Sequence, residues 1–324
     1  MKKYLARRLM IMIPMLLGIT ILSFLLMNLA PGDPVMMFVD RERGVPTQEE
    51  IDRVRAKMGL DKPVIVRYFY WLANTVQGDL GYSMFSGQSV MNEIKARIGT
   101  TVMLSALSMV VSALLGMIVG LICALNQYKL ADYVLSVLAF IGLSLPSFWL
   151  AMMLILFFTN TLGWLPSIGL IDLSLRNPTP LMDLWDRVRH LILPVTAMSL
   201  ASIGAWARYQ RAAFLEVQQQ DYIRTARSKG LSERTISFRH ALRNAALPII
   251  TILGGSLPGL IGGAFLIESI FSLPGMGRLG LMAIMNRDFP VIMAVTLFSS
   301  ILVLLGTFIA DITYALVDPR IRYT

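Results

Sequence analysis

Two acidic side chains lie inside apolar runs of this 324-residue chain, where an ionisable group is costly. Glu268 falls toward the end of one run, just before "SIFSLPGMGR", and Asp311 toward the end of the last run. Carboxylates in such places bind cations, relay protons or line a substrate path. Positions near run ends also suit helix pairing or the membrane interface. Glu268 is therefore a candidate for the substrate path, and Asp311 a weaker one.

The motifs of an enzyme are missing from the sequence. It contains no Gly-x-x-x-x-Gly-Lys-Ser/Thr phosphate loop, no Gly-x-Ser-x-Gly and no His-Glu-x-x-His. Glycine-rich "GGSLPGLIGG" at 254–263 lacks a lysine and suits close helix packing. Cys123 is the single cysteine, and His190 and His240 have no partners at metal-ligand spacing. We therefore expect no catalytic residue, metal site or cofactor in this chain.

The most basic part of the chain, "QDYIRTARSKGLSERTISFRH" at residues 220–240, separates two apolar runs. Leu215, Tyr222 and Ala226 share one face of a helix that would continue the preceding run. Gly230 is predicted to end that helix.

A second helix is predicted to begin directly after this glycine. Ser232 is a good N-cap, Glu233 suits the first turn, and Leu231 and Ile236 are spaced for a hydrophobic staple. Two helices around a glycine form a rigid elbow. Such a shape suits the docking of another protein better than a loop that only carries charge.

Membrane helices are the elements that would position these residues. Only 15% of the residues are charged and 56% are hydrophobic, whereas soluble domains carry about 25% charged residues. Six apolar runs are long enough to cross the hydrocarbon core. Because lipid requires an internally bonded backbone, we expect an all-α integral membrane protein. The first run is too long for a cleaved signal peptide, so it is predicted to be a retained span. The runs are 9–30, 100–125, 134–162, 191–212, 245–271 and 289–317.

Charge predicts that both termini are cytoplasmic. With that orientation, the inside segments carry 15 Lys and Arg against five acids, and the outside segments carry 14 against 13. This asymmetry follows the positive-inside tendency. The net charge of +9 is then explained by orientation, and a nucleic-acid partner is not needed.

The first outer loop is predicted to be a small helical insert. Thr47 and Glu50 have the spacing of a capping box, and Gly59 would end that helix. A second helix is predicted from Pro63 to about Val76, and it carries four consecutive aromatic residues. These aromatic residues favour an interfacial membrane anchor, with a docking face for an extracytoplasmic partner as the alternative.

The basic elbow resembles the coupling loop of bacterial ABC importer permeases, closest to the peptide and nickel branch. The general motif of that family is Glu-Ala-Ala-x-x-x-Gly. Gly230 matches its glycine and Ala226 its second alanine, whereas Arg224 and Thr225 replace the Glu and the first Ala, as is usual in the peptide branch. The Leu-Pro of the motif comes later than usual, at Leu247–Pro248.

Further matches follow in order along the chain. They are "RRLMIMIPMLLGITILSFLLMNLAPGDP" near the start, "GDLGYS" at 78–83, "LSLPSFW" at 143–149 and "FSLPGMGRLG" at 271–280. The resemblance implies the type I ABC importer permease fold with six transmembrane helices, in a multi-pass protein of the bacterial cytoplasmic (inner) membrane. The long first outer loop is similar to that of the first permease of a peptide importer.

The resemblance also implies partners. The chain would pair with a homologous second permease, above two ATPase subunits that bind ATP and Mg²⁺, and an extracytoplasmic binding protein would deliver a peptide. The permease itself would be non-catalytic. The coupling contacts with the ATPase would come from Tyr222, Arg224, Thr225, Ala226, Arg227, Lys229, Gly230 and Leu231.

The expected organisation is one membrane domain with one insert. Residues 1–30 form the N-terminal segment and first span, 31–99 the outer insert, 100–317 the permease core with its coupling loop at 213–244, and 318–324 a cytoplasmic tail. Nickel or glutathione import within the same family, and a secondary carrier that works alone, remain alternatives.

Overall fold

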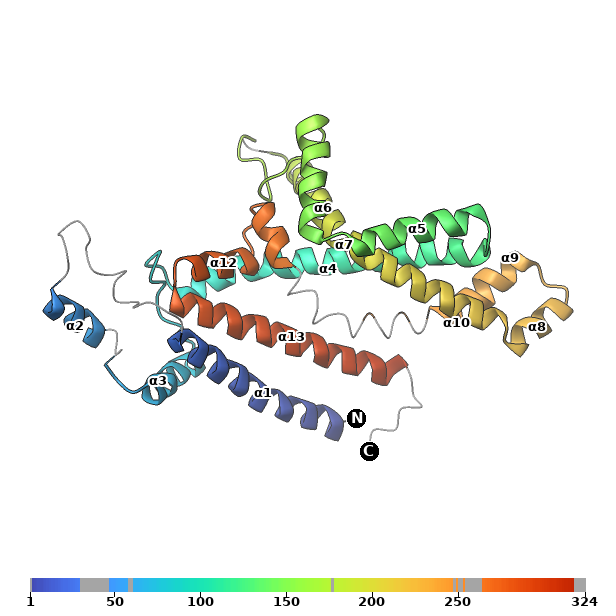
Figure 1. The fold of residues 1–324 in the computed structure, drawn as a ribbon. Coiled ribbons are helices and arrows are strands. Elements are labelled where there is room, and N and C mark those ends of the chain that lie inside the picture. Colours follow the sequence, from blue (N-terminus) through green and yellow to red (C-terminus); the bar gives the residue numbers. More distant parts are fainter. Residues whose placement is uncertain are drawn as a thin grey trace. The chain divides into compact units, whose positions relative to one another are not determined.

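The computed structural model describes residues 2–29, 47–57, 61–175, 178–246, 249, 253 and 264–317, and in these ranges regular structure is helical (Figure 1). The chain divides into two compact units, one of Ile98–Arg278 with Leu302–Thr324 and the other of Lys2–Arg97 with Leu279–Ile301. The α-helices are α1 (Lys2–Leu29), α2 (Gln48–Lys57), α3 (Val64–Val76), α4 (Val90–Leu125), α5 (Leu130–Ser144), α6 (Ser147–Leu154), α7 (Pro180–Gln218), α8 (Asp221–Ser228), α9 (Glu233–Thr235), α10 (Leu242–Ala245), α12 (Met276–Met285) and α13 (Phe289–Val317). Two π-helices, η3 (Ile155–Thr161) and η4 (Ile236–Ala241), continue α6 and α9.

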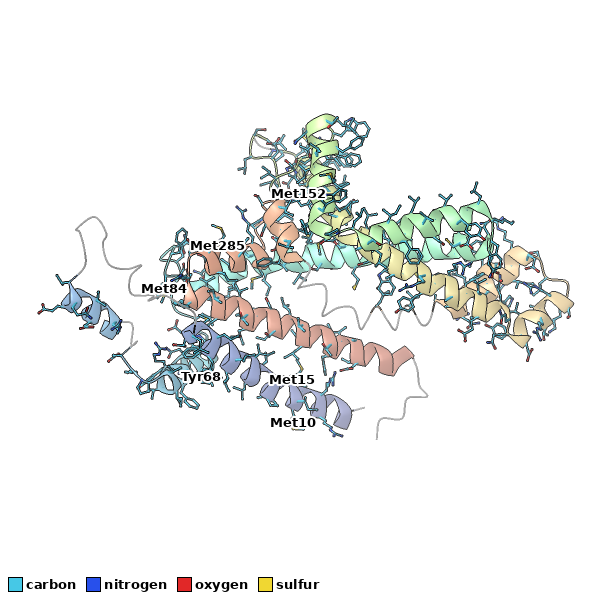
Figure 2. The ribbon with its side chains drawn as sticks, in the orientation of Figure 1. Met10, Met15, Tyr68, Met84, Met152 and Met285 are labelled. Atoms are coloured by element: carbon cyan, nitrogen blue, oxygen red, sulfur yellow. The ribbon has the colours of Figure 1, made fainter. Side chains whose placement is uncertain are left out.

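Four helices are long and apolar enough to cross a membrane, and they correspond to four of the six predicted runs. They are Ala6–Leu29 of α1, the whole of α4 and α7, and Phe289–Ile312 of α13. Apolar side chains such as Met10 and Met15 project outward from α1, as lipid-facing residues do (Figure 2).

The predicted run 134–162 is not one continuous helix. The chain bends by 106° between α5 and the arm formed by α6 and η3. The cause is Pro146, which lacks an N–H group and holds Leu145 in an extended conformation with ψ 133°. Each arm has 15 residues, about 22 Å of helix, which is shorter than the hydrocarbon core of about 30 Å. The pair therefore forms either one broken span or a re-entrant turn.

The predicted run 245–271 lies largely outside the described residues. Its last part, 264–270, is helical. Pro248 and the glycine-rich 254–263 also lie outside the described residues, so their predicted packing role stays a prediction.

The two helices predicted in the outer loop are present as α2 and α3. α2 begins directly after Thr47, and α3 begins after Pro63 and ends at Val76, as predicted. The stop predicted at Gly59 lies outside the described residues.

Close helix approach in the larger unit depends on glycines. A Cβ atom at Gly204 of α7 would overlap the backbone oxygen of Ala139 in α5. A Cβ atom at Gly120 of α4 would overlap that of Ala207 in α7. Small residues of this kind let membrane helices pack backbone to backbone. α7 is consequently held against both α4 and α5.

Candidate functional site

The basic elbow is a separate folded element after α7. α7 ends at Gln218, and Gln220 is extended at ψ 148° before α8 begins. The predicted continuous helix from Leu215 to Ala226 is therefore wrong. The break turns α8 so that Ile223 and Ala226 are buried while Tyr222 is exposed. Burial of these apolar side chains favours the break, although Leu215, Tyr222 and Ala226 have the spacing of one helix face.

Gly230 ends α8 in the way its position predicts. Its φ is +76°, a left-handed conformation that favours glycine. The Gly230 N–H donates to the Arg227 carbonyl at 2.9 Å, and the Leu231 N–H donates to the Ala226 carbonyl at 3.4 Å. This pair of bonds is the Schellman motif. The turn between the two arms is thus fixed by backbone hydrogen bonds.

The second arm begins where the sequence predicts it. The Ser232 hydroxyl accepts the Thr235 N–H at 3.3 Å, so Ser232 is the N-cap of α9, and Glu233 lies in its first turn. The arm then continues through η4 into α10 without a break. Ile236 is buried and Leu231 is exposed, and the staple between them stays a prediction.

A hydrophobic core connects the elbow to two membrane helices. It combines residues of both arms with Ala124 at the end of α4 and Phe214 near the end of α7. The Tyr222 hydroxyl also accepts the Asn244 Nδ2–H at 3.1 Å, which joins α8 to α10. Movement of the elbow would therefore be transmitted directly to α4 and α7. The elbow residues of this core are Ile223, Ala226, Ile236, Ala241 and Ala245.

Most of the predicted coupling residues lie on the exposed side of the elbow. These are Tyr222, Arg224, Thr225, Arg227, Lys229, Gly230 and Leu231, whereas Ala226 belongs to the buried core. Sequence reasoning missed Phe238, an exposed aromatic side chain on the second arm. The sequence feature that could have identified Phe238 is its place as a large apolar residue within the basic segment 220–240.

Glu268 is fully buried and accepts hydrogen bonds from three donors. The Thr101 hydroxyl donates to its Oε1 at 2.6 Å, and the N–H groups of Gly277 and Arg278 donate to its Oε2 at 2.7 and 3.2 Å. Gly277 and Arg278 lie in the first turn of α12, where a carboxylate suits the helix dipole. This geometry gives Glu268 a structural role as the cap of α12. A role for it in the substrate path stays a prediction.

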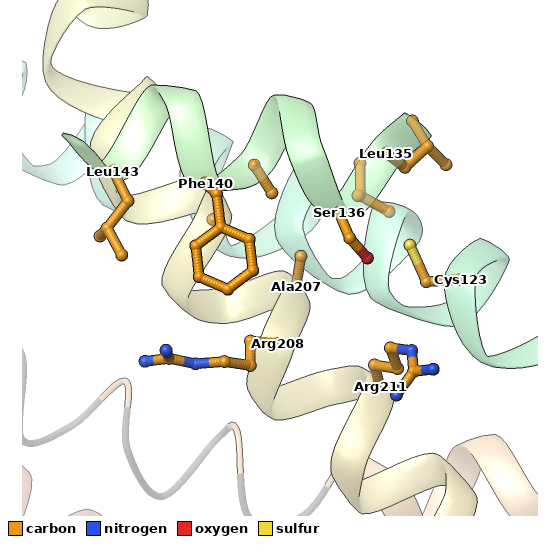
Figure 3. A pocket seen from close by; sticks show the side chains of 11 residues that line it. Cys123, Leu135, Ser136, Phe140, Leu143, Ala207, Arg208 and Arg211 are labelled. Atoms are coloured by element: carbon orange, nitrogen blue, oxygen red, sulfur yellow. The ribbon is translucent and has the colours of Figure 1, made fainter. Parts of the chain in front are cut away.

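A small cavity lies between α4, α5 and α7, with a volume of about 170 Å³ (Figure 3). Its lining is mainly apolar and includes Cys123 and Phe140. Beside it, Arg211 of α7 donates from Nε and from a terminal nitrogen to the carboxylate of Asp132 at 2.9 and 2.8 Å. Asp132 is buried. This bidentate ion pair joins the start of α5 to α7, and sequence reasoning missed it.

A second cavity, of about 540 Å³, is lined by loop residues 163–173 and the first turns of α7. His190 is buried there, with Nδ1 2.8 Å from the Asp186 backbone oxygen. In the described part of the chain, no three His, Cys, Asp or Glu residues are grouped as metal ligands. His190 is thus held within the fold by its own helix.

Comparison with known families decides the class of this protein. Residues 116–323 match the family described as binding-protein-dependent transport system inner membrane component, and residues 1–105 match the family of its N-terminal part. The chain belongs to this transport family. This inner membrane component is accordingly a non-catalytic permease subunit, and the resemblance inferred from the elbow is confirmed.

Similar proteins match this permease over its full length. The oligopeptide transport system permease protein AppB of Bacillus subtilis (strain 168) is 43% identical over 326 residues, covering 100% of both chains. The di/tripeptide transport system permease protein DppB of Pseudomonas aeruginosa (strain UCBPP-PA14) is 38% identical, covering 100% of this chain and 99% of that one. A putative peptide permease of Brucella ovis is 40% identical over 100% of both chains.

The fold of the permease is also found among solved structures. A chain of the inward-facing MetNI methionine ABC transporter superposes with a TM-score of 0.56 at 19% identity, covering 70% of this chain and 97% of that one. The predicted fold class, an all-α membrane protein of the importer permease type, is therefore confirmed. The number of spans and the side of each terminus stay predictions.

Proposed function

We propose that this chain is the permease subunit of an ABC importer that moves di- and oligopeptides across the bacterial inner membrane. The observation that carries the proposal is the elbow, an exposed rigid element whose core includes the ends of α4 and α7. The full-length likeness to proteins named as oligopeptide and di/tripeptide permeases supports a peptide substrate over nickel or glutathione.

The proposed assembly has four kinds of subunit. This chain pairs with a homologous second permease, two ATPase subunits bind ATP and Mg²⁺ beneath them, and an extracytoplasmic binding protein delivers peptide. The chain crosses the membrane six times with both termini in the cytoplasm, and its coupling loop spans 213–244. Residues 31–99 form the outer insert and 100–317 the permease core. The positive-inside distribution of charge supports this orientation.

The elbow couples ATP to transport in this assembly. When ATP closes the ATPase pair, the docked elbow moves with it. The shared core passes this displacement to α4 through Ala124 and to α7 through Phe214. Because packed cores switch between discrete arrangements, the displacement opens the path toward the outside, and hydrolysis resets it.

The exposed side of the elbow supplies the docking chemistry. Arg224 and Lys229 offer cations to an acidic groove, and Tyr222, Leu231 and Phe238 offer exposed apolar area. Apart from Gly230 and its two chain neighbours, no atom of the described residues lies within 4 Å of the position that a Cβ atom would take at Gly230. A partner can therefore approach the backbone closely at this turn.

Copurification tests the proposal. The chain expressed with its presumed partners and extracted in mild detergent should bring an ATPase with it, and Arg224→Glu should reduce that yield. Arg187→Glu is the matched control, because Arg187 is also an exposed helix-surface arginine with a same-helix acidic partner. Equal yields from both variants, or no ATPase in any preparation, would refute docking through the elbow.

Uptake by the reconstituted complex tests the substrate. Proteoliposomes containing the four kinds of subunit should accumulate labelled di- and oligopeptides only when ATP is enclosed with the ATPases. Nickel and glutathione are the comparison substrates. Accumulation that persists without ATP would indicate a secondary carrier instead.

A further inference from the structure

Helix α3 packs against α1 at a depth that lies inside the membrane span. The Tyr68 hydroxyl is 3.0 Å from Thr20 Oγ1, and the Tyr68 ring lies edge-on to Phe24 at 5.5 Å between ring centroids. Thr20 is nine residues, and Phe24 five residues, before the end of α1 at Leu29. At about 1.5 Å per residue, Thr20 lies about 13 Å and Phe24 about 7 Å from that end.

Thr20 stays inside the hydrocarbon core even if α1 is shifted along the membrane normal. The apolar span Ala6–Leu29 has 24 residues, about 36 Å of helix, against a hydrocarbon core of about 30 Å. Even if the whole surplus of about 6 Å extended beyond the membrane at Leu29, Thr20 would remain about 7 Å inside the hydrocarbon. Tyr68 therefore contacts α1 below the membrane surface.

The side of α3 that faces away from α1 is apolar and exposed. Ile65 is 71% exposed, Phe69 61% and Val76 80%, and they lie at helical spacing on one face. The polar residues of α3 are Arg67, Asn74 and Thr75, and none of them lies on that face. In water, such a face would leave large apolar side chains without cover.

Two cations are placed as interfacial anchors. Lys62, just before α3, has its Nζ 4.4 Å from the centroid of the Tyr70 ring, and the Arg67 guanidinium lies 6.0 Å from the centroid of the Phe24 ring. Long cationic side chains beside aromatic rings are typical of the headgroup level of a bilayer, where the apolar stem is buried and the charge reaches water or phosphate.

We propose that α3 is embedded in the bilayer interface at the carboxyl end of α1, with the face of Ile65, Phe69 and Val76 against lipid acyl chains. Interfacial helices of this kind bury their apolar face about 5–10 Å into the headgroup and acyl boundary, which agrees with the contact depth on α1. The outer insert thereby anchors the outer end of the first span at the membrane interface. This proposal does not depend on which substrate the permease carries.

Spin labels test the position of α3. Cys123→Ala removes the single cysteine, and Ile65→Cys, Phe69→Cys or Val76→Cys then carries a nitroxide in the full chain within phosphatidylethanolamine and phosphatidylglycerol nanodiscs. Leu22→Cys, on the exposed face of α1 within the span, is the lipid control, and Gln88→Cys, in an exposed loop, is the aqueous control. Collision rates with oxygen and with the water-soluble nickel complex NiEDDA are measured for each label.

The labels on α3 should resemble Leu22→Cys, with high oxygen and low NiEDDA collision rates. Labels that resemble Gln88→Cys would overturn the proposal, because the face would then lie in water. Low rates with both probes would also overturn it, because a protein surface, such as an extracytoplasmic partner, would then cover the face. Three positions are tested so that one poorly folded variant does not decide the result.

Discussion

Arg227 of α8 forms an ion pair with Glu233 of α9 across the Gly230 turn, with Nε 2.9 Å from Oε1. Both side chains are exposed, so the pair contributes at most about 1 kcal/mol to folding. Its position between the two arms suggests a role in coupling and not in stability. It joins the two arms of the elbow directly across the Gly230 turn, on the exposed side of the elbow.

Reversal of one charge of this pair should therefore impair coupling more than stability. We expect Glu233→Arg to lower ATP-driven peptide uptake while the free energy of unfolding changes by less than about 1 kcal/mol. The charge-swapped double variant Arg227→Glu with Glu233→Arg should recover part of the uptake. A double variant no better than either single variant would show that the residues act separately on the partner.

Gly230→Ala should reduce coupling through the backbone. A side chain at φ +76° costs about 1 kcal/mol, since glycine alone adopts this conformation without strain. We expect ATPase activity to continue while peptide uptake falls. Gly78→Ala is the matched control, with φ +85° and equally open space. If both variants lose uptake equally, strain in general and not the elbow is responsible.

Asp132→Ala should destabilise the membrane core. It leaves the Arg211 guanidinium, whose side chain is 29% exposed, without its bidentate partner, at a cost of about 1–3 kcal/mol. Asp183→Ala is the control, because it removes an exposed pair with Arg187 on the same helix and should cost less than about 1 kcal/mol. Thermal unfolding in detergent measures the stability of both variants. Similar melting temperatures for Asp132→Ala and Asp183→Ala would contradict the expected difference.

Thr101→Val should loosen the start of α12. The Thr101 hydroxyl donates to Glu268 and accepts the Met276 N–H at 2.8 Å, so its removal leaves two buried groups unsatisfied, at about 1–3 kcal/mol each. Thr101→Ser keeps the hydroxyl and should be close to wild type. Hydrogen exchange at the first turn of α12 reports the difference. Equal exchange in Thr101→Val and the wild type would contradict this role of the hydroxyl group.

Gly204→Ala should force α7 away from α5. The added methyl group overlaps the Ala139 backbone oxygen, and overpacking of this kind costs about 1–3 kcal/mol. Gly99→Ala on α4 is the control, since nothing lies within 4 Å of the new atom and alanine favours a helix by about 1 kcal/mol. Opposite shifts in melting temperature are expected. A gain in stability from Gly204→Ala would mean that the two helices are not in contact in the membrane.

Local chemistry made part of the elbow predictable. Gly230 after α8, Ser232 before α9 and Glu233 in its first turn act on neighbours a few residues away, so their roles can be inferred without a tertiary structure. The end of α7 at Gln218 was not predictable in the same way. It depends on the burial of Ile223 against α4 and α7, which no local spacing encodes.

The sequence by itself determined the membrane class, the helical fold and the family, because apolar run length, charge asymmetry and short motifs are properties of the chain alone. Tertiary structure decided which residues meet. Asp132 and Arg211 are 79 residues apart, and Thr101 and Glu268 are 167 apart. Each pair forms because packing of distant helices brings a donor to an otherwise costly buried carboxylate. Helical periodicity acts over a few turns, so it does not specify partners at that separation.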